Sequence, residues 1–391
     1  MSHAQLSPSS AVRWMTCPGS VALCKDLKDT SSKFADEGTD AHELAALCLG
    51  KDTDASGYVG TTMAKGNIVS VDMAQHVQSY VDYVRDLVLS TNGELLIEQR
   101  LPISDITGEA DAHGTSDVVI LAGDELIVVD LKFGRGVAVE ADDNPQLQIY
   151  ALAAYNEFSL VADFKTVRMV IHQPRLNAVS EWTQTVEELL AFGESVWSAA
   201  VQTRFDGLGL RTAPLKPSEK GCKFCRAKAT CPALRAEVTD CFEKVQPTPE
   251  TAVDLLAEAM GKADLIEGWL KAIRAETESR LFAGVAIPGW KVVQGKRGNR
   301  AWGDKVAAEE LLKAMRIKHD QMYDYSVISP TTAEKLATAE VIGKRQWPKV
   351  KALITQSEGK PSVAPESDKR PALDMSAVTD DFEVVAVDDL A

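Results

Sequence analysis

The chain has 391 residues, of which 45% are hydrophobic and 25% are charged; these are globular values that exclude wholesale disorder and low-complexity scaffolds. No run of about 18 apolar residues is present, so no membrane-spanning helix is expected, and the polar N-terminus lacks an apolar signal core. The formal charge of -15 argues against nonspecific nucleic-acid binding over the whole surface. A local basic groove, or a carboxylate cluster bridged to nucleic acid by metal ions, stays compatible with it.

Helical and strand periodicities alternate along the first two thirds of the chain. Three helices are predicted first, over residues 11–15, 41–49 and 71–89. The period then changes, and three strands are predicted over residues 94–101, 114–121 and 125–132, with a tight turn at Gly123. A helix, a strand and a helix follow, over residues 144–155, 165–172 and 186–205. This order predicts an α/β fold with a central mixed sheet flanked by helices.

The remaining chain is predicted to be mainly helical. A segment rich in Pro, Lys and Cys runs from Pro214 to Pro232. A long amphipathic helix is predicted over residues 247–283, a short strand over 289–293 and a helix over 304–315. From Gly359 onward the chain is rich in Pro, Ser and Asp, and we expect a mobile acidic tail.

Two neighbouring strands each carry an aspartate where the apolar residues begin or end. The first is Gly114-Thr115-Ser116-Asp117, and the second ends in Asp130-Leu131-Lys132. A hairpin turn separates them, so Asp117 and Asp130 can lie side by side and share a Mg²⁺ or Mn²⁺ ion. Lys132 points to the same face as Asp130 because the side-chain period of a strand is two. Hydrolysis of a phosphodiester needs these groups, although a solvated strand end with an ion pair explains the triplet equally well.

The order of these motifs resembles the RecB-type PD-(D/E)XK nucleases. The signature of that group is Gly-x-x-Asp, then Asp-x-Lys, then a helix with Gln-x-x-x-Tyr, which the chain supplies as Gln146 to Tyr150. An upstream segment, Gly38 to His42, looks like the helical Gly-x-x-x-His motif of the group. More narrowly, the segments 9–20, 37–49, 144–147 and 366–371 resemble a phage-encoded branch long classed as a domain of unknown function.

The resemblance implies a restriction-endonuclease-like core and a role for each matching residue. Asp117, Asp130 and His42 would be metal ligands together with the Leu131 carbonyl, and Lys132 would be the catalytic lysine. Gln146 and Tyr150 would be active-site helix residues. Three alternatives stay open from the residues alone. Gly108-Glu109-Ala110-Asp111 also fits Gly-x-x-Asp, although Asp117 is preferred because an apolar strand follows it. His42 fits a polar position on an amphipathic helix. Glu98 fits a further acidic group from the first strand, but a surface strand end is preferred.

Three of the seven cysteines form a C-x₂-C-x₅-C motif, Cys222, Cys225 and Cys231, whose spacing is typical of a metal site. Cys17 is the best fourth ligand and Cys24 competes with it, whereas Cys48 fits a helical core position. With a distant N-terminal cysteine, the motif resembles the [4Fe–4S] staple of AddB-type and CRISPR-associated RecB-like nucleases. Zn²⁺ uses the same thiolates and is the alternative metal. Such a clasp would close a loop of about two hundred residues.

The resemblance implies three regions: a RecB-like nuclease domain over residues 1–242 closed by the cysteine cluster, a helical accessory region over 243–358, and an acidic flexible tail over 359–391. Basic residues crowd the cysteine segment, namely Lys216, Lys220, Lys223, Arg226, Lys228 and Arg235. A second basic stretch, residues 289–302, contains Trp290 and Trp302 and either contacts a phosphate backbone or is a solvated turn with two core tryptophans.

Three functional hypotheses follow. The first is a Mg²⁺- or Mn²⁺-dependent deoxyribonuclease, an exonuclease that processes DNA ends or single strands in phage recombination or replication, with a single-strand annealing or binding protein as partner. The second is a non-catalytic DNA-binding or assembly subunit that retains the nuclease fold. The third is a zinc-stapled interaction protein. With no signal core, reduced thiols and a location in the bacterial host cytoplasm are expected for all three.

Overall fold

The computed structural model describes residues 4–27, 33–136, 138–204, 213–244, 253–291, 305–315, 318, 323 and 329–354. The chain divides into two compact units, residues 1–294 and 295–391. The predicted tail, the segment 366–371 and Trp302 lie outside the described residues. The three predicted regions, with boundaries at residues 242 and 358, stay predictions.

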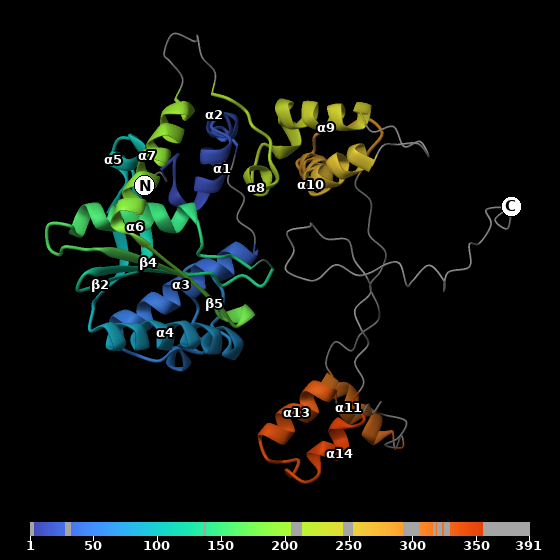
Figure 1. Cartoon of the computed structure of the whole chain (residues 1–391). Helices are drawn as coiled ribbons and strands as arrows, with labels where there is room; N and C mark the ends of the chain where they lie inside the picture. The colour runs from blue at the N-terminus through green and yellow to red at the C-terminus, as the bar shows by residue number, and fades with distance from the viewer. Residues whose placement is uncertain are drawn as a thin grey trace. The chain divides into compact units, whose positions relative to one another are not determined.

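Five strands form one sheet in the order β1-β2-β3-β4-β5. Their bounds are β1 Glu94–Pro102, β2 His113–Ala122, β3 Glu125–Leu131, β4 Thr166–Gln173 and β5 Ala178–Thr185. β3 and β4 run parallel, while the other neighbouring pairs are antiparallel. The mixed sheet flanked by helices confirms the predicted α/β class (Figure 1). The edge strand β5 was not predicted, because most of its side chains are exposed and polar residues interrupt its apolar alternation.

Helices surround the sheet in the first unit, and the described part of the second unit also contains helices. The helices of the first unit are α1 Ala11–Thr16, α2 Ser20–Cys24, α3 Lys33–Lys51, α4 Val71–Thr91, α5 Ser104–Thr107, α6 Pro145–Phe158, α7 Val186–Thr203, α8 Glu219–Cys222, α9 Pro232–Lys244 and α10 Val253–Phe282. Short 3₁₀ turns are η1 Pro8–Ser10, η2 Ala55–Tyr58, η3 Pro174–Leu176 and η4 Lys228–Thr230. The second unit contains α11 Lys305–Ala314, α13 Pro330–Thr338 and α14 Trp347–Lys351. None of the described helices is long and apolar enough to cross a membrane.

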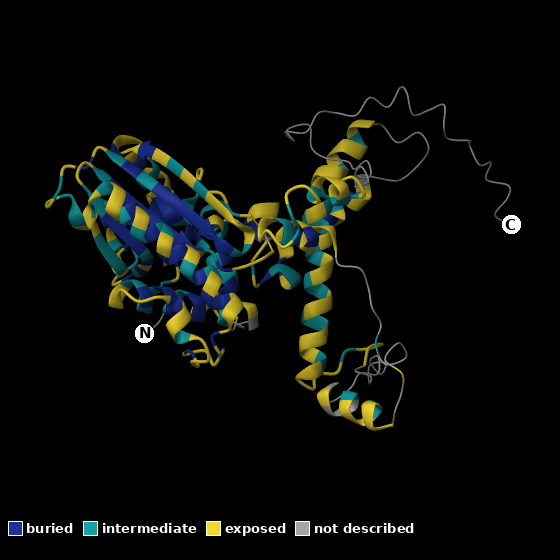
Figure 2. Cartoon of the chain, turned by 90° about the horizontal axis from the view of Figure 1, so that it is seen from below, coloured by how far each residue is buried: buried dark blue, intermediate teal, exposed yellow. Residues whose placement is uncertain are grey.

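The sheet is covered on both faces, so its central strands are apolar on both sides. On β3, Leu126 and Val128 face the core formed with α1, α6 and α7, while Ile127 and Val129 face the core formed with α3 and α4. Figure 1 shows these two helical layers on opposite sides of the strands, and Figure 2 shows the buried residues running along the sheet between them. The continuous run Leu126 to Val129 is thus the pattern of a strand buried on both faces.

Capping side chains set where the helices near the sheet begin. Ser70 accepts a hydrogen bond from the Met73 amide at the start of α4. Thr185 and Glu188 form a reciprocal capping box at the start of α7. Asn144 caps α6, whose first residue is Pro145, a residue suited to that position because the first turn needs no N–H donor there. α6 makes the crossover between β3 and β4, so this cap fixes the helix that follows the end of β3.

The cysteine segment forms a small third core in the first unit. Cys222, Cys231, Leu234 and Val238 are buried together, and Leu265, Ile266 and Trp269 of α10 pack against them. The predicted long helix is therefore present as α10, although the predicted residues 247–252 lie outside the described residues. Of the strand predicted over residues 289–293, Trp290 makes a single bridge with Ile287, and Trp290 is 70% exposed. Trp290 is thus not a core tryptophan.

Candidate active site

The strand register brings the two predicted aspartates to adjacent positions. In the antiparallel β2–β3 ladder the last pair is Val118 with Val129, so Asp117 and Asp130 occupy the next position, where the ladder ends. There the Leu131 amide donates a hydrogen bond of 2.8 Å to Asp117 Oδ2, not to a main-chain carbonyl. The two carboxylates therefore sit where β2 and β3 separate, at an end of the sheet that α6 and α3 both reach.

Asp130, Lys132 and Gln146 form a closed polar network. Lys132 Nζ lies 2.9 Å from Asp130 Oδ2 and donates a hydrogen bond of 3.0 Å to Gln146 Oε1. Gln146 Nε2 in turn donates to Asp130 Oδ1 at 3.0 Å. Asp130 is only 5% exposed, and this burial raises its pKa, while the Lys132 charge lowers the pKa and the Asp117 charge raises it. The network holds a buried carboxylate, an ammonium group and an amide within contact of one another.

Asp117 has a second partner on α3, the predicted ligand His42. His42 Nδ1 lies 2.9 Å from Asp117 Oδ1. Burial lowers the pKa of His42, but the charge of Asp117, its hydrogen bond and the charge of Asp130 together raise it above the ordinary value. The structure thus brings His42, Asp117, Asp130, Lys132 and Gln146 into one constellation, drawn from α3, β2, β3 and α6.

Tyr150 and Gly114 pack together behind the carboxylates. Tyr150 lies on the buried face of α6, and burial, followed by the charges of Asp130 and Asp117, raises the pKa of its phenol. A Cβ on Gly114 would lie 2.8 Å from the Tyr150 ring and 3.0 Å from the Pro8 ring. Glycine in Gly114-x-x-Asp117 therefore allows the Tyr150 ring to lie against β2.

From the sequence, Glu98 was assigned to a surface strand end in preference to this site, and Tyr80 was not recognised. Glu98 lies within β1 with a φ of 48°, and the β1–β2 ladder skips the position where it would pair with Asp117. Glu98, Tyr80, His42 and Asp117 line one narrow pocket, which places Glu98 beside the site and not at a strand end. Partial burial and the Asp117 charge raise the pKa of Glu98. Tyr80 is buried, and its hydroxyl has no hydrogen-bond partner among the described residues.

The positive φ of Glu98 leaves no trace in a sequence pattern. The signal that was available is the interruption of the apolar run Leu95 to Ile97 by a carboxylate in the middle of a strand. For Tyr80 there was no such signal, because a tyrosine at a helical core position is ordinarily a packing residue.

An arginine network holds α3 against the loop that follows β3. Arg175 Nη1 donates a hydrogen bond of 3.0 Å to Glu37 Oε2, five residues before His42. The Arg175 guanidinium lies over the Phe133 ring at 4.0 Å from its centroid, and Phe133 directly follows Lys132. The Arg175 side chain is 7% exposed, and its hydrogen bond lowers the pKa of Glu37. This arginine links the segment that carries His42 to the one that carries Lys132.

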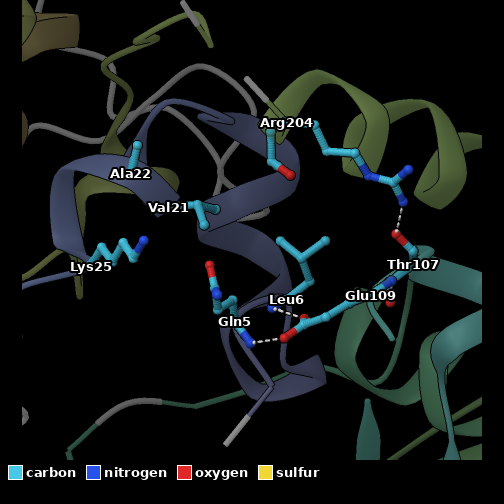
Figure 3. Close-up of a pocket in the computed structure, with 9 residues that line it drawn as sticks. Gln5, Leu6, Val21, Ala22, Lys25, Thr107, Glu109 and Arg204 are labelled. Carbon is cyan, nitrogen blue, oxygen red and sulfur yellow. Dashed lines mark hydrogen bonds between the residues drawn. The ribbon is translucent and has the colours of Figure 1, made fainter. Parts of the chain in front are cut away.

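The second Gly-x-x-Asp sequence, Gly108 to Asp111, serves a different part of the molecule. Glu109 accepts hydrogen bonds from the backbone amides of Gln5 and Leu6 at 2.8 and 2.9 Å. Arg204 donates to the Thr107 carbonyl at 2.9 Å, where a Cβ on Gly108 would clash with its guanidinium. Figure 3 shows these contacts around a pocket between the N-terminal segment and α7. Asp111 lies with Glu109 in the turn before β2, and Asp117 is the aspartate beside His42.

The two N-terminal cysteines both reach the cysteine segment. The charges of Cys17 and Cys231 act on Cys222, whose pKa is raised first by burial and then by these neighbours. Cys24 Sγ lies 3.8 Å from Cys225 Sγ. The Cys225 hydrogen bond lowers the pKa of Cys24 to about 5, and the same contact raises the pKa of Cys225.

Backbone contacts hold these segments close. Gly19 N–H donates to the Pro214 carbonyl at 2.9 Å, and a Cβ on Gly19 would lie 2.6 Å from the Ala213 carbonyl oxygen. The remaining two cysteines lie elsewhere: Cys48 is fully buried in the α3–α4 core, as predicted, and Cys241 is buried on α9.

A family model described as "Protein of unknown function (DUF2800)" matches residues 3–371. The chain belongs to the DUF2800 family. Among solved structures, the chain is similar to one titled "Crystal structure of SSO0001", with 14% sequence identity over 55% of this chain and 95% of that chain and a TM-score of 0.23. The family match spans both compact units of the DUF2800 chain.

In the part of the DUF2800 chain that the structure describes, no three His, Cys, Asp or Glu side chains are arranged to hold a metal ion as they stand. The donors at the carboxylate site are instead engaged with one another: His42 with Asp117, and Asp130 with Lys132. Their chemistry nevertheless fits a hard divalent cation. The charge of Asp117 raises the pKa of Asp130, which is buried with Lys132 Nζ at 2.9 Å from its Oδ2, and two adjacent carboxylates are the hard oxygen donors that such a cation prefers.

The cysteine cluster of the DUF2800 chain fits a soft metal, again by the chemistry of its donor atoms. Its donors are thiols, and two sulfurs already accept backbone hydrogen bonds, as thiolate ligands commonly do. Lys216 N–H donates to Cys17 Sγ at 3.2 Å, and Leu234 N–H donates to Cys231 Sγ at 3.5 Å. With Cys24 beside Cys225, the segment gathers five thiols, one more than a tetrahedral site or a [4Fe–4S] cluster uses.

Proposed function

We propose that this DUF2800 protein is a metal-dependent deoxyribonuclease with a PD-(D/E)XK-type core, which hydrolyses phosphodiester bonds and acts as an exonuclease on DNA ends. The observation that carries the proposal is the Asp130–Lys132–Gln146 network beside the Asp117–His42 pair, at the point where β2 and β3 separate. Phosphodiester hydrolysis needs clustered oxygen ligands and a cation close to the scissile phosphate. A simple surface ion pair would not be buried or tied to a helix N-terminus.

Each side chain has a separable task under this proposal. Asp117 and Asp130 would hold a divalent cation with the Leu131 carbonyl and His42. When bound, a Mg²⁺ or Mn²⁺ ion supplies Lewis acidity that neutralises phosphate charge and lowers the pKa of water. Lys132 Nζ lies 2.9 Å from Asp130 Oδ2 and would stabilise charge on the phosphate or orient the attacking water. Gln146 keeps Lys132 and Asp130 in register because it bonds to both.

The same proposal also assigns a role to the cysteine segment, which would hold a metal clasp and provide the surface that contacts DNA. The basic residues around the cysteine motif would contact phosphates next to a [4Fe–4S] cluster, or a Zn²⁺ ion, held by Cys222, Cys225, Cys231 and Cys17. The resemblance to phage-encoded nucleases supports a role in phage recombination or replication. A single-strand annealing or binding protein would then be the partner.

Cleavage of end-labelled linear DNA and of closed circular DNA, with Mg²⁺ or Mn²⁺, tests the proposal. We expect loss of the linear DNA only, and a fall in rate of about 10²–10⁴-fold in Asp130→Asn and Lys132→Met, because each removes a charged group at the reacting phosphate. Asp117→Asn should behave like Asp130→Asn. Asp111→Asn is the matched control, since Asp111 belongs to the other Gly-x-x-Asp sequence, and it should keep the wild-type rate.

The proposal is overturned if pure protein cleaves no DNA form with either ion, or if Asp130→Asn and Lys132→Met cleave as fast as the wild type. Salt-dependent DNA binding without cleavage by the wild type would instead identify a non-catalytic DNA-binding subunit. Zinc in the purified protein together with no DNA affinity would identify an interaction protein with a zinc staple.

A further inference from the structure

The cysteine segment contains one thiol more than a metal clasp uses, and that thiol touches a proposed ligand. Cys24 on α2 and Cys225 are 201 residues apart in sequence, yet their sulfurs lie 3.8 Å apart. A disulfide has an S–S distance of about 2.0 Å, so forming one has to bring these two neighbouring sulfurs closer together. Cys24 is 2% exposed, whereas Cys225 is partly exposed in the turn between α8 and η4.

The backbone around this pair is held in place by other contacts. Arg226, the residue after Cys225, donates to the Leu27 carbonyl at 2.9 Å and to the Cys24 carbonyl at 3.4 Å. A few residues earlier in the chain, Gly19 N–H donates to the Pro214 carbonyl. The two segments therefore stay together without a bond between the sulfurs, and forming one does not require them to meet by chance.

We propose that Cys24 and Cys225 are a redox modification site, where a disulfide forms in competition with metal binding at the clasp. The competition rests on the proposed function, because Cys225 is a ligand of the proposed clasp; the disulfide itself does not. Disulfides in a reducing compartment are ordinarily transient and redox-sensing, which suits a pair held in contact but unbonded.

The oxidant is a small-molecule disulfide, and the exchange balances in two steps. The proton of the partly exposed Cys225 passes to the Cys24 sulfur across their contact, and the Cys225 sulfur then attacks one sulfur of the oxidant, forms a mixed disulfide and releases one small thiolate. Cys24 then gives up this proton, and its thiolate attacks Cys225 Sγ, forms the Cys24–Cys225 bond and releases the second small thiolate. The two protons from the protein thiols end on the released thiolates. One oxidant molecule is thus reduced to two thiols while two cysteines are oxidised to one disulfide.

The consequence is that a disulfide replaces the metal site as the link between the N-terminal segment and the cysteine segment. The disulfide closes nearly the same long loop as the metal would, so the N-terminal segment stays attached. It also withdraws Cys225 from the ligand set. Cys17 is less suited to replace Cys24 in this reaction, because its sulfur already accepts the Lys216 amide.

Peptide mapping of the full-length chain tests the site. The protein is freed of metal with a chelator, treated with glutathione disulfide and digested without reduction. We expect a Cys24–Cys225 cross-linked peptide as the main disulfide, which dithiothreitol removes. In Cys24→Ser the cross-link should be absent, and Cys225 should instead carry a trapped glutathione. Cys48→Ser is the matched control, since Cys48 is buried in another core, and it should form the cross-link like the wild type.

A second readout is metal uptake. The oxidised chain should take up less iron or zinc on reconstitution than the reduced chain, and dithiothreitol should restore the uptake. Pairing of Cys225 with Cys17, Cys222 or Cys231, or glutathione on Cys225 of the wild type with no Cys24 cross-link, would overturn the proposal. Cys24→Ala, checked by circular dichroism, separates loss of the bond from loss of the fold. Because none of these measurements requires DNA cleavage, failure of the nuclease proposal leaves them interpretable.

Discussion

At the scale of single residues, burial shifts the pKa of a titratable group most where the group lacks a charged or hydrogen-bonding partner. Asp130 is buried and tolerated because Lys132 and Gln146 contact its carboxylate. His172, at the end of β4, has no comparable partner. It is 5% exposed between the rings of Tyr80 and Tyr83, whose centroids lie 5.6 and 5.1 Å away, and its Nδ1 has no hydrogen-bond partner among the described residues. Burial therefore lowers the pKa of His172 to about 4.

This pKa predicts a loss of stability in acid. In the unfolded chain His172 binds a proton near pH 6.5, whereas in the folded chain it stays neutral until about pH 4. The free energy of unfolding is therefore unaffected by this group above pH 6.5 and decreases as the pH falls from there toward 4. At pH 5 the loss is about 2 kcal/mol relative to pH 7.5, from about 1.4 kcal/mol per pH unit. Urea unfolding of the wild type and of His172→Phe at both pH values measures it. The variant should be less sensitive to pH by this amount, and an equal pH dependence in the two proteins would contradict the assignment.

At the scale of elements, the site depends on where α6 begins. Asn144 Oδ1 accepts the amides of Gln146 and Leu147 at 3.0 and 3.3 Å. Gln146 is thus held by its backbone at the cap and by its side chain at Asp130 and Lys132. The helix start and the polar network are coupled through one residue.

Removing the cap should therefore affect both stability and catalysis. We expect Asn144→Ala to lower the free energy of unfolding by about 1 kcal/mol, because two amides of the first turn lose their acceptor. DNA cleavage should fall as well, through displacement of Gln146. Asn144→Asp keeps the acceptor oxygen and should retain the stability within about 0.5 kcal/mol. Thermal unfolding and the cleavage rate of both variants give the comparison, and wild-type behaviour of Asn144→Ala would show that the cap does not position the network.

At the scale of the whole molecule, the first compact unit extends beyond the cysteine motif. Leu234 and Val238 on α9 are buried, and Leu265 and Trp269 of α10 pack against the same core. The compact unit ends at residue 294. A nuclease domain that ended at residue 242 would leave this apolar surface without its cover.

Two truncated chains distinguish these boundaries. A chain of residues 1–294 should unfold cooperatively and show the proposed DNA cleavage at the rate of the full-length protein. A chain of residues 1–242 should melt at a lower temperature and aggregate more readily, because removal of α10 exposes Leu234 and Val238. Circular dichroism and light scattering during heating measure both. Equal melting temperatures would place the boundary at residue 242.

The fold was predictable where the chain carries a strong period. The run Leu126 to Val129 and the apolar positions of α4 predicted a strand and a helix, and both are confirmed; that both faces of this strand are covered was seen only in the structure. The strand β5 was missed because an edge strand needs no apolar alternation to form its ladder with β4. The order Asp117, Asp130 and Lys132 was readable because antiparallel strands joined by a short turn place such residues at neighbouring register positions.

The sequence by itself determined the α/β class and the DUF2800 family, and it nominated the aspartates, the lysine and the cysteine motif, because period, motif order and ligand spacing are local properties. Only the tertiary structure decided that Glu98 lies beside Asp117, that Arg175 links α3 to the segment after β3, and that Cys24 touches Cys225. Those contacts join residues far apart in the chain. The first depends on a position that the β1–β2 ladder skips, the second on how α3 packs, and the third on how the N-terminal segment meets the cysteine segment. None of these features produces a periodic pattern in the sequence.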